Sequence, residues 1–220
     1  KAYAALYDKR WTVAAQAAKA GMDVGYYSLD TDYAKLFTYD GENSRERIFT
    51  MQYLRGVNTH IALRQLGSRL SAGVSNEKPT QAMVDSYECI DGLTIDKSPL
   101  YNPQKPYVNR DPRLNMTIAV PGSVYLGFQF ETHPDSLRVW NYNVSPAVRV
   151  NNTDATNAFA TFTSYLWRKW TDVKDLGYTQ ECAGDIILMR YADLLLMYAE
   201  AKIEANEIDN SVYQAINAVR

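Results

Sequence analysis

Apolar residues recur at helical spacing near the N-terminus of the chain. Trp11, Ala14 and Ala18 repeat at intervals of three and four residues, and Gly21 follows them. This pattern predicts a helix–turn–helix over residues 2–21, with Gly21 ending the second helix. The small alanines on the apolar face would let a neighbouring helix approach closely.

The C-terminal part of the chain repeats this pattern. Residues 186–206 predict one helix, and the residues after the polar stretch NEIDNS predict a second, which Ser211 or Asn210 can cap. Arg190 and Asp193 lie three residues apart, where their side chains can pair on a helix. Antiparallel helix pairs of this length resemble tetratricopeptide-type units, although the full consensus repeat is missing.

Between these ends the pattern changes to short extended pieces and turns. Residues 76–88 predict one short helix that begins at Pro79-Thr80, and residues 116–120 (MTIAV) predict the clearest strand. Residues 89–165 are rich in Pro, Gly and Asn, which favours loops. The fold class expected is therefore mostly α, with tetratricopeptide-like helical hairpins packed with an irregular, loop-rich region that contains short strands.

The same pattern divides the chain into three regions. Residues 1–60 hold the first helical hairpin and its following turns, residues 61–180 the loop-rich region, and residues 181–220 a C-terminal hairpin. Both ends of the chain lie in apparent helices. We therefore expect the chain to be a portion of a longer protein.

Charge and cysteine content exclude several classes of protein. The net charge of −2 over 220 residues shows no basic excess, which argues against a nucleic-acid-binding function. No apolar run approaches the roughly 18 residues that a membrane span requires. Cys89 and Cys182 are far apart and lack CxxC spacing, so two buried free thiols are expected, with a single disulfide left open.

The sequence contains no recognisable catalytic or metal-binding motif. His60 and His133 stand alone without HExxH spacing, and there is no GxSxG, P-loop or GxGxxG pattern. Carboxylates are plentiful, but no Asp or Glu pair is singled out for glycoside hydrolysis. We therefore predict that the protein is not an enzyme and that it has no catalytic residues, no recognisable metal ligands and no cofactor; the sequence leaves Ca²⁺ binding open.

The motif NRDPR at residues 109–113 supports two interpretations. Arg110 and Arg113 flank Asp111-Pro112, and a guanidinium can bind a carboxylate or backbone carbonyls through two hydrogen bonds. One interpretation is a clamp for an anionic ligand, and the other is a buried turn held by arginine. The structural interpretation is favoured.

Several segments together resemble one protein family. They are, in chain order, YDKRWTVAAQAAKAGMDVGYYSLDTDYAKLF (7–37), KPTQAMVDSYECIDGL (78–93), YNPQKPYVNRDPRLNMTI (101–118) and DIILMRYADLLLMYAEAK…AINAVR (185–220). They resemble the SusD/RagB family of outer-membrane nutrient-binding lipoproteins from Bacteroides-type bacteria. The combination of PT…VDSYE…DG, PY.NRDPR and RYADLLLMYAEA is far more specific than any one of these motifs.

This resemblance implies a non-catalytic binding function at the extracellular face of the outer membrane. Family members bind oligo- or polysaccharides, or in some cases peptides, and pass them to a partner SusC-like TonB-dependent transporter. A lipid anchor on an N-terminal Cys would lie outside this segment, which resembles the C-terminal portion of the family. The alternative function is a structural helical-repeat interaction module without a small-molecule site.

Aromatic composition suggests where a glycan would bind. The chain has 17 Tyr and 4 Trp against 6 Phe, and such rings with polar edges suit sugars, which offer apolar faces and hydroxyl edges. In the stretch LRVWNYNVS (137–145), an extended backbone would place two rings on one side and two amides on the other. The predicted ligand-binding residues are Trp140, Tyr142, Asn141 and Asn143, with Tyr125 and Tyr101 as weaker candidates.

Overall fold

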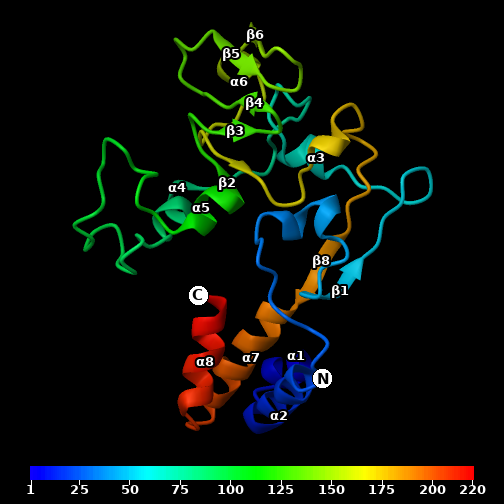
Figure 1. The fold of residues 1–220 in the computed structure, drawn as a ribbon, viewed down its shortest axis with the longest axis vertical. Coiled ribbons are helices and arrows are strands. Elements are labelled where there is room, and N and C mark those ends of the chain that lie inside the picture. The colour runs from blue at the N-terminus through cyan, green and yellow to red at the C-terminus, as the bar shows by residue number, and fades with distance from the viewer. The chain divides into compact units, whose positions relative to one another are not determined.

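The computed structural model describes residues 1–220 and contains eight α-helices, eight short strands and three 3₁₀ helices (Figure 1). The α-helices are α1 (Ala2–Tyr7), α2 (Trp11–Met22), α3 (Ala62–Leu66), α4 (Gln81–Asp85), α5 (Pro112–Thr117), α6 (Thr153–Thr156), α7 (Tyr191–Glu204) and α8 (Asn210–Val219). The strands are β1 (Arg47–Met51), β2 (Ile118–Ala119), β3 (Val124–Tyr125), β4 (Phe128–Gln129), β5 (Arg138–Asn141), β6 (Val148–Asn151), β7 (Leu166–Trp167) and β8 (Ile186–Arg190). The 3₁₀ helices are Lys35–Phe37, Tyr39–Gly41 and Val173–Asp175.

The chain forms two compact units. The helical unit comprises residues 1–32, 40–51 and 186–220, and the loop-rich unit comprises residues 33–39 and 52–185. The two terminal segments, which the sequence places in separate regions, thus share one unit. Helices dominate only this helical unit, so the fold as a whole is mixed rather than mostly α.

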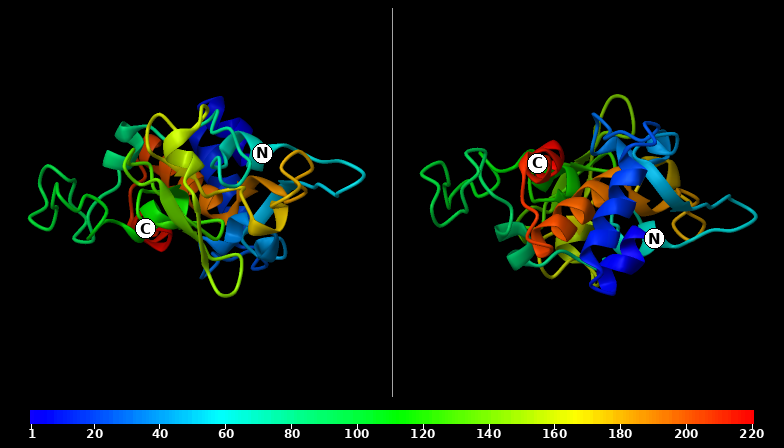
Figure 2. Two further views of the ribbon diagram at one scale, coloured as in Figure 1. Left: turned by 90° about the horizontal axis from the view of Figure 1, so that it is seen from above. Right: turned by 90° about the horizontal axis from the view of Figure 1, so that it is seen from below.

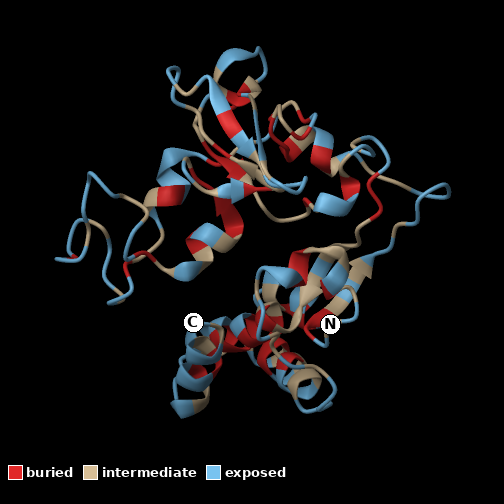
Figure 3. Cartoon of the chain, turned by 45° about the horizontal axis from the view of Figure 1, so that its top comes forward, coloured by how far each residue is buried: buried red, intermediate tan, exposed pale blue.

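Small residues allow close packing in the helical unit. Helix α7 lies between α8 and the pair α1 and α2 (Figure 2), and the buried residues of these helices face one another (Figure 3). The sequence predicted that Gly21 ends the second helix. This is wrong, because Gly21 lies inside α2, which continues to Met22. A Cβ on Gly21 would lie 2.8 Å from Leu194 Cδ2, so the glycine allows α2 to approach α7.

Replacing Ala18 with leucine should test this packing. Ala18 is fully buried against the α7 core. The larger side chain would force α2 and α7 apart, and we expect a loss of about 1–3 kcal/mol in the free energy of unfolding. Urea denaturation of Ala18→Leu would measure this loss. Ala20→Leu, on the exposed side of the same helix, should change stability by less than about 0.5 kcal/mol.

The predicted helix over residues 186–206 is wrong in its first turn. Residues 186–190 form β8, which pairs antiparallel with β1, and α7 begins only at Tyr191. The backbone N–H and C=O groups of β8 find their hydrogen-bond partners in β1, more than a hundred residues earlier, instead of within a helix. Arg190 then caps α7, where its backbone N–H donates to Asp193 Oδ2 at 2.8 Å.

The C-terminal hairpin is confirmed, although its second helix has a different cap from the one predicted. Asp209 precedes α8 and accepts a hydrogen bond from the Ser211 backbone N–H at 2.8 Å. A carboxylate at this position satisfies a free donor of the first turn and interacts favourably with the helix dipole. Tetratricopeptide character remains a prediction for these helices.

Short local elements build the loop-rich unit. The predicted short helix is α4, and Thr80 caps it as expected by accepting from the Met83 N–H at 3.2 Å. The predicted strand over residues 116–120 is shorter than expected, because α5 extends to Thr117 and only Ile118–Ala119 form β2. Strand β2 pairs with β7, and β3, β4, β5 and β6 form one antiparallel sheet in that order.

The NRDPR motif forms a buried turn held by arginine. Arg110 is 5% exposed and donates to the carbonyl oxygens of Pro106, Val84 and Tyr87 at 2.9, 2.7 and 2.7 Å. Asp111 caps α5 by accepting from the Arg113 N–H at 2.9 Å. These contacts support the structural interpretation of the motif.

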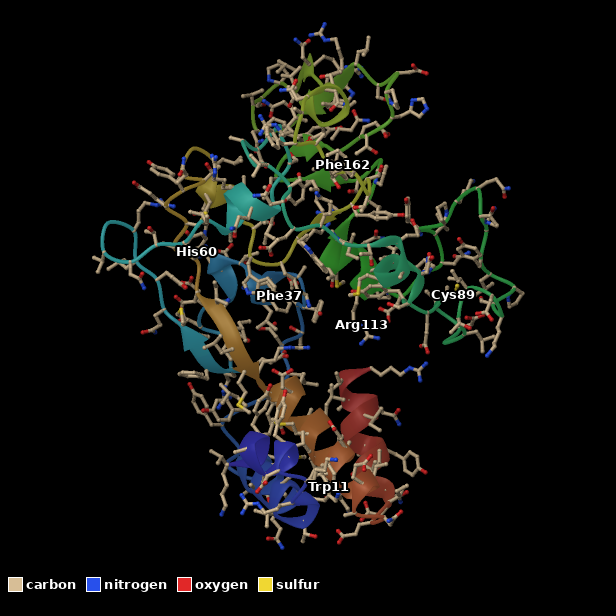
Figure 4. The ribbon with its side chains drawn as sticks, turned by 180° about the vertical axis from the view of Figure 1, so that it is seen from behind. Trp11, Phe37, His60, Cys89, Arg113 and Phe162 are labelled. Carbon is tan, nitrogen blue, oxygen red and sulfur yellow. The ribbon has the colours of Figure 1, made fainter.

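The two cysteines are free and buried, as expected. Figure 4 labels Cys89 in the loop segment that follows α4, and Arg113 at α5. Burial is the main cause that raises the pKa of the Cys182 thiol to about 11. Burial shields both thiols from disulfide exchange. None of the helices has both the length and the apolar character that crossing a membrane would require.

Candidate functional site

The predicted ligand stretch, residues 137–145, supplies β5 and part of the turn that leads to β6, the edge strand of the four-stranded sheet (Figure 1). The β5–β6 hairpin pairs Arg138 with Asn151, Val139 with Val150 and Trp140 with Arg149. Successive side chains of a strand point to opposite faces. Val139 is accordingly buried at 1% exposure, whereas Trp140 is 38% exposed. The hairpin therefore has an inner apolar face and an outer face that carries the indole.

The base of the hairpin is held by a buried amide. Asn152 is fully buried, and its Nδ2 donates to the carbonyl oxygens of Glu131 and Ser136 at 2.8 and 2.7 Å. Its backbone N–H donates to the Leu137 carbonyl oxygen at 2.9 Å. Asn152 thus ties the end of β6 to the segment that precedes β5, and this fixes the position of the hairpin's outer face.

Trp140 shares the outer face of the hairpin with two arginines. The Arg149 guanidinium carbon is 5.3 Å from the centroid of the indole ring, within the range of a cation–π contact. Arg138 Nη2 donates to the Arg149 carbonyl oxygen at 2.7 Å, and Arg149 Nη2 donates to the Arg138 carbonyl oxygen at 2.6 Å. We call Arg138, Trp140 and Arg149 the outer platform.

The two predicted asparagines shape the end of the hairpin. Asn141 Oδ1 accepts from the Asn143 N–H at 2.9 Å, and Asn143 Nδ2 donates to the Leu126 carbonyl oxygen at 3.0 Å. Gly127 has φ +77°, and a Cβ there would lie 2.1 Å from Asn143 Oδ1. Glycine is therefore required where Asn143 packs on the β3–β4 turn. These hydrogen bonds give both amides a structural role.

Tyr142 is the second exposed ring of the predicted site. Its side chain is 48% exposed, and its backbone N–H donates to the Gly127 carbonyl oxygen at 2.7 Å. It follows β5 directly, two residues after Trp140. The structure thus leaves both predicted rings of the stretch accessible.

The weaker candidate Tyr125 is not available to a ligand. It is 2% exposed in the core formed with Phe130 and Leu166, and its ring centroid lies 6.3 Å from that of Phe130. Burial is also the main cause that raises the pKa of its phenol. Its place on the inner face of β3 corrects the sequence-based assignment. Tyr101 is half-buried beside Arg110, whose guanidinium carbon lies 5.7 Å from its ring.

The sequence interpretation missed Arg138 and Arg149. Arg138 precedes Trp140 by two positions, so the alternation that selected Tyr142 also selects Arg138. Arg149 could be found only through the pairing of β5 with β6, which places it opposite Trp140. The site is therefore more basic than the sequence suggested.

His60 has a structural role in the loop-rich unit. Its Nε2 lies 2.9 Å from the Gly184 carbonyl oxygen, and its Nδ1 accepts from the Ala62 N–H at 3.2 Å. Among residues 1–220, no group of three or more His, Cys, Asp and Glu side chains is placed to hold a metal ion.

A separate open groove of about 870 Å³ lies on the helical unit. Two carboxylates are present among otherwise apolar and aromatic side chains. The residues that line it are Tyr3, Leu6, Tyr7, Phe49, Leu188, Met189, Asp193, Leu196, Met197 and Glu200. Its apolar lining suits a protein segment better than a hydroxyl-rich ligand.

Comparison with known proteins identifies the family. The family model described as SusD family matches residues 29–220, and the chain belongs to this family. No curated protein matched the chain.

Solved structures share this fold. A SusD-like carbohydrate-binding protein from Bacteroides fragilis matches with 26% identity and a TM-score of 0.84, over 100% of this chain and 42% of its own. A second SusD-like protein from that species matches with 23% identity and a TM-score of 0.70, over 99% and 44%. Surface glycan-binding protein A from Bacteroides thetaiotaomicron, solved with laminarihexaose, matches with 18% identity and a TM-score of 0.54, over 97% and 43%. The chain thus spans about two fifths of the length of these proteins.

Proposed function

We propose that the protein of which this chain is a part binds glycans at the bacterial cell surface without modifying them. Family membership and the likeness to a SusD-like carbohydrate-binding protein support this function. Within the chain, the observation that carries it is the exposed indole of Trp140 on a hairpin anchored by Asn152. A fixed aromatic ring can stack on the apolar face of a sugar at little entropic cost.

We also propose the cellular setting that the family resemblance implies. A lipid anchor outside this segment would hold the protein on the outer face of the outer membrane. A SusC-like TonB-dependent transporter would be its partner and would receive the bound oligosaccharide. Co-purification of the full-length protein with a transporter encoded beside its gene would test this partnership, and recovery without any transporter would contradict it.

Replacing Trp140 with alanine should weaken glycan binding by the full-length protein at least tenfold. The expected loss corresponds to about 1.4 kcal/mol, which is within the range for removing an aromatic contact at a binding site. Isothermal titration calorimetry against a polysaccharide that the wild-type protein binds would measure the change. A glycan panel on an affinity gel would first identify that polysaccharide.

A matched control separates the site from exposed rings in general. Tyr213 on α8 is 58% exposed and lies in the helical unit, so Tyr213→Ala should leave affinity unchanged. Equal affinity of Trp140→Ala and the wild type would remove the outer platform from the binding site. Thermal unfolding of each variant would show that the fold is retained.

The alternative function, a helical interaction module without a small-molecule site, would use the groove on the helical unit. Phe49 and Leu188 in that groove are 61% and 53% exposed, which favours an apolar protein partner there. Under this alternative, no polysaccharide in the panel would bind, and Leu188→Arg would disrupt partner capture. Binding of a glycan with loss in Trp140→Ala would decide against it.

A further inference from the structure

The charged side chains of the β5–β6 hairpin are all positive. Residues 136–151 contain two arginines and no Asp, Glu or Lys. Just before the hairpin, Nδ1 of His133 lies 3.8 Å from Oδ2 of Asp135, and both side chains are well exposed. Asp154, after the hairpin, is buried beneath it and accepts from the Arg69 N–H at 2.6 Å. The outer face is therefore locally cationic in a chain whose net charge is −2.

Both guanidinium groups are fixed and still have donors to offer. Each uses Nη2 to reach the carbonyl oxygen of the opposite arginine, and neither is paired with a carboxylate of this chain. A guanidinium has five N–H donors in a rigid fork. Because these hydrogen bonds already hold both guanidinium groups, binding an anion would cost little additional side-chain entropy.

The outer platform places positive charge directly beside aromatic surface. The Arg149 guanidinium carbon lies 5.3 Å from the centroid of the Trp140 ring, in a cation–π contact that leaves part of the indole exposed. A ring that stacks on the indole would bring a carboxylate or sulfate on its edge to the guanidinium fork. Arginine binds such planar or trigonal oxygen groups through two parallel hydrogen bonds, which gives specificity as well as energy.

We propose that the outer platform selects an acidic glycan, one whose residues carry a carboxylate or sulfate group. Trp140 stacks on the sugar ring, and Arg138 and Arg149 bind its anionic group. This assignment rests on the proposed glycan-binding function and specifies the class of sugar that this site takes.

The test compares matched polymers with the full-length protein. Polygalacturonate would be titrated beside its methyl-esterified form, and chondroitin sulfate beside desulfated chondroitin with its carboxyl groups reduced. We expect at least one acidic polymer to bind about tenfold or more tightly than its neutral counterpart. That preference should fall as sodium chloride is raised from low concentration to about 0.5 M, because salt screens exposed charges.

Charge-matched variants show which residues cause the preference for acidic polymers. The double variant Arg138→Gln/Arg149→Gln should lose the preference for the acidic polymer, whereas Arg138→Lys/Arg149→Lys should keep part of it. A control double variant, Lys97→Gln/Lys105→Gln, removes the same total charge from another exposed loop and should keep the full preference.

Two kinds of failure are distinguishable. Equal binding of acidic and neutral polymers, a preference insensitive to salt, or equal losses in the arginine and lysine double variants would overturn the acidic-glycan assignment and leave glycan binding standing. Binding of no polymer at all, acidic or neutral, would overturn both proposals. The salt series uses the wild-type protein, so it decides the question even where an arginine variant does not fold.

Discussion

Replacing Arg110 with alanine is expected to destabilise the loop-rich unit by about 3–5 kcal/mol. The guanidinium is buried and holds three carbonyl oxygens, of Pro106, Val84 and Tyr87, at 2.7–2.9 Å. Hydrogen bonds to a charged group contribute about 1.5–3 kcal/mol each, and the carbonyls left without a donor remain buried. Chemical denaturation of the full-length protein would measure the loss.

Hydrogen exchange would show where the loss occurs. The amides of α4 and α5, which flank the Arg110 contacts, should exchange faster in Arg110→Ala than in the wild type. Arg113→Ala is the control, because the Arg113 side chain is more exposed and pairs with Asp111 of the same turn. It should cost about 1 kcal/mol or less. Equal losses in the two variants would show that the turn does not depend on the buried guanidinium.

Replacing Arg190 with methionine is expected to destabilise the helical unit by about 3–5 kcal/mol. Arg190 Nη1 lies 2.7 Å from Glu46 Oε1, and the Glu46 side chain is 3% exposed. Glu46 Oε2 also accepts from the Asp30 N–H at 2.7 Å. Removing one member of a buried ion pair leaves the other charge without a partner, which costs more than the pair itself contributes.

The double variant Glu46→Gln/Arg190→Met provides the control. It removes both charges, so its loss should be clearly smaller than the sum of the two single losses. Thermal or urea unfolding of the wild type and the three variants would give the coupling energy of the pair. Additive losses would mean that the ion pair does not organise the start of α7.

Residue patterns predicted the elements that depend on neighbours in sequence. The spacing of Trp11, Ala14 and Ala18 predicted α2, and Pro79-Thr80 predicted the start of α4, because helix periodicity and capping involve residues within four positions. The same local rule failed for residues 186–190. Their apolar pattern suits a helix as well as a buried strand, and only pairing with β1 decided between them.

The candidate site divides in the same way. Alternation along an extended segment placed Trp140 and Tyr142 on the surface, and both are exposed. It could not show that Tyr125 faces the core, because that depends on which face of the sheet the rest of the unit covers. Nor could it show that Asn141 and Asn143 are engaged by the backbone of the turn they shape.

The sequence by itself determined the family of the chain, its terminal helices and the exposed aromatic stretch, since each depends on short motifs or local periodicity. Only the tertiary structure decided the strand at 186–190, the close approach of α2 to α7 at Gly21, and the position of Arg149 opposite Trp140. These features arise from pairing and packing between segments distant in the chain. The energy of such contacts depends on the partner as much as on the residue itself.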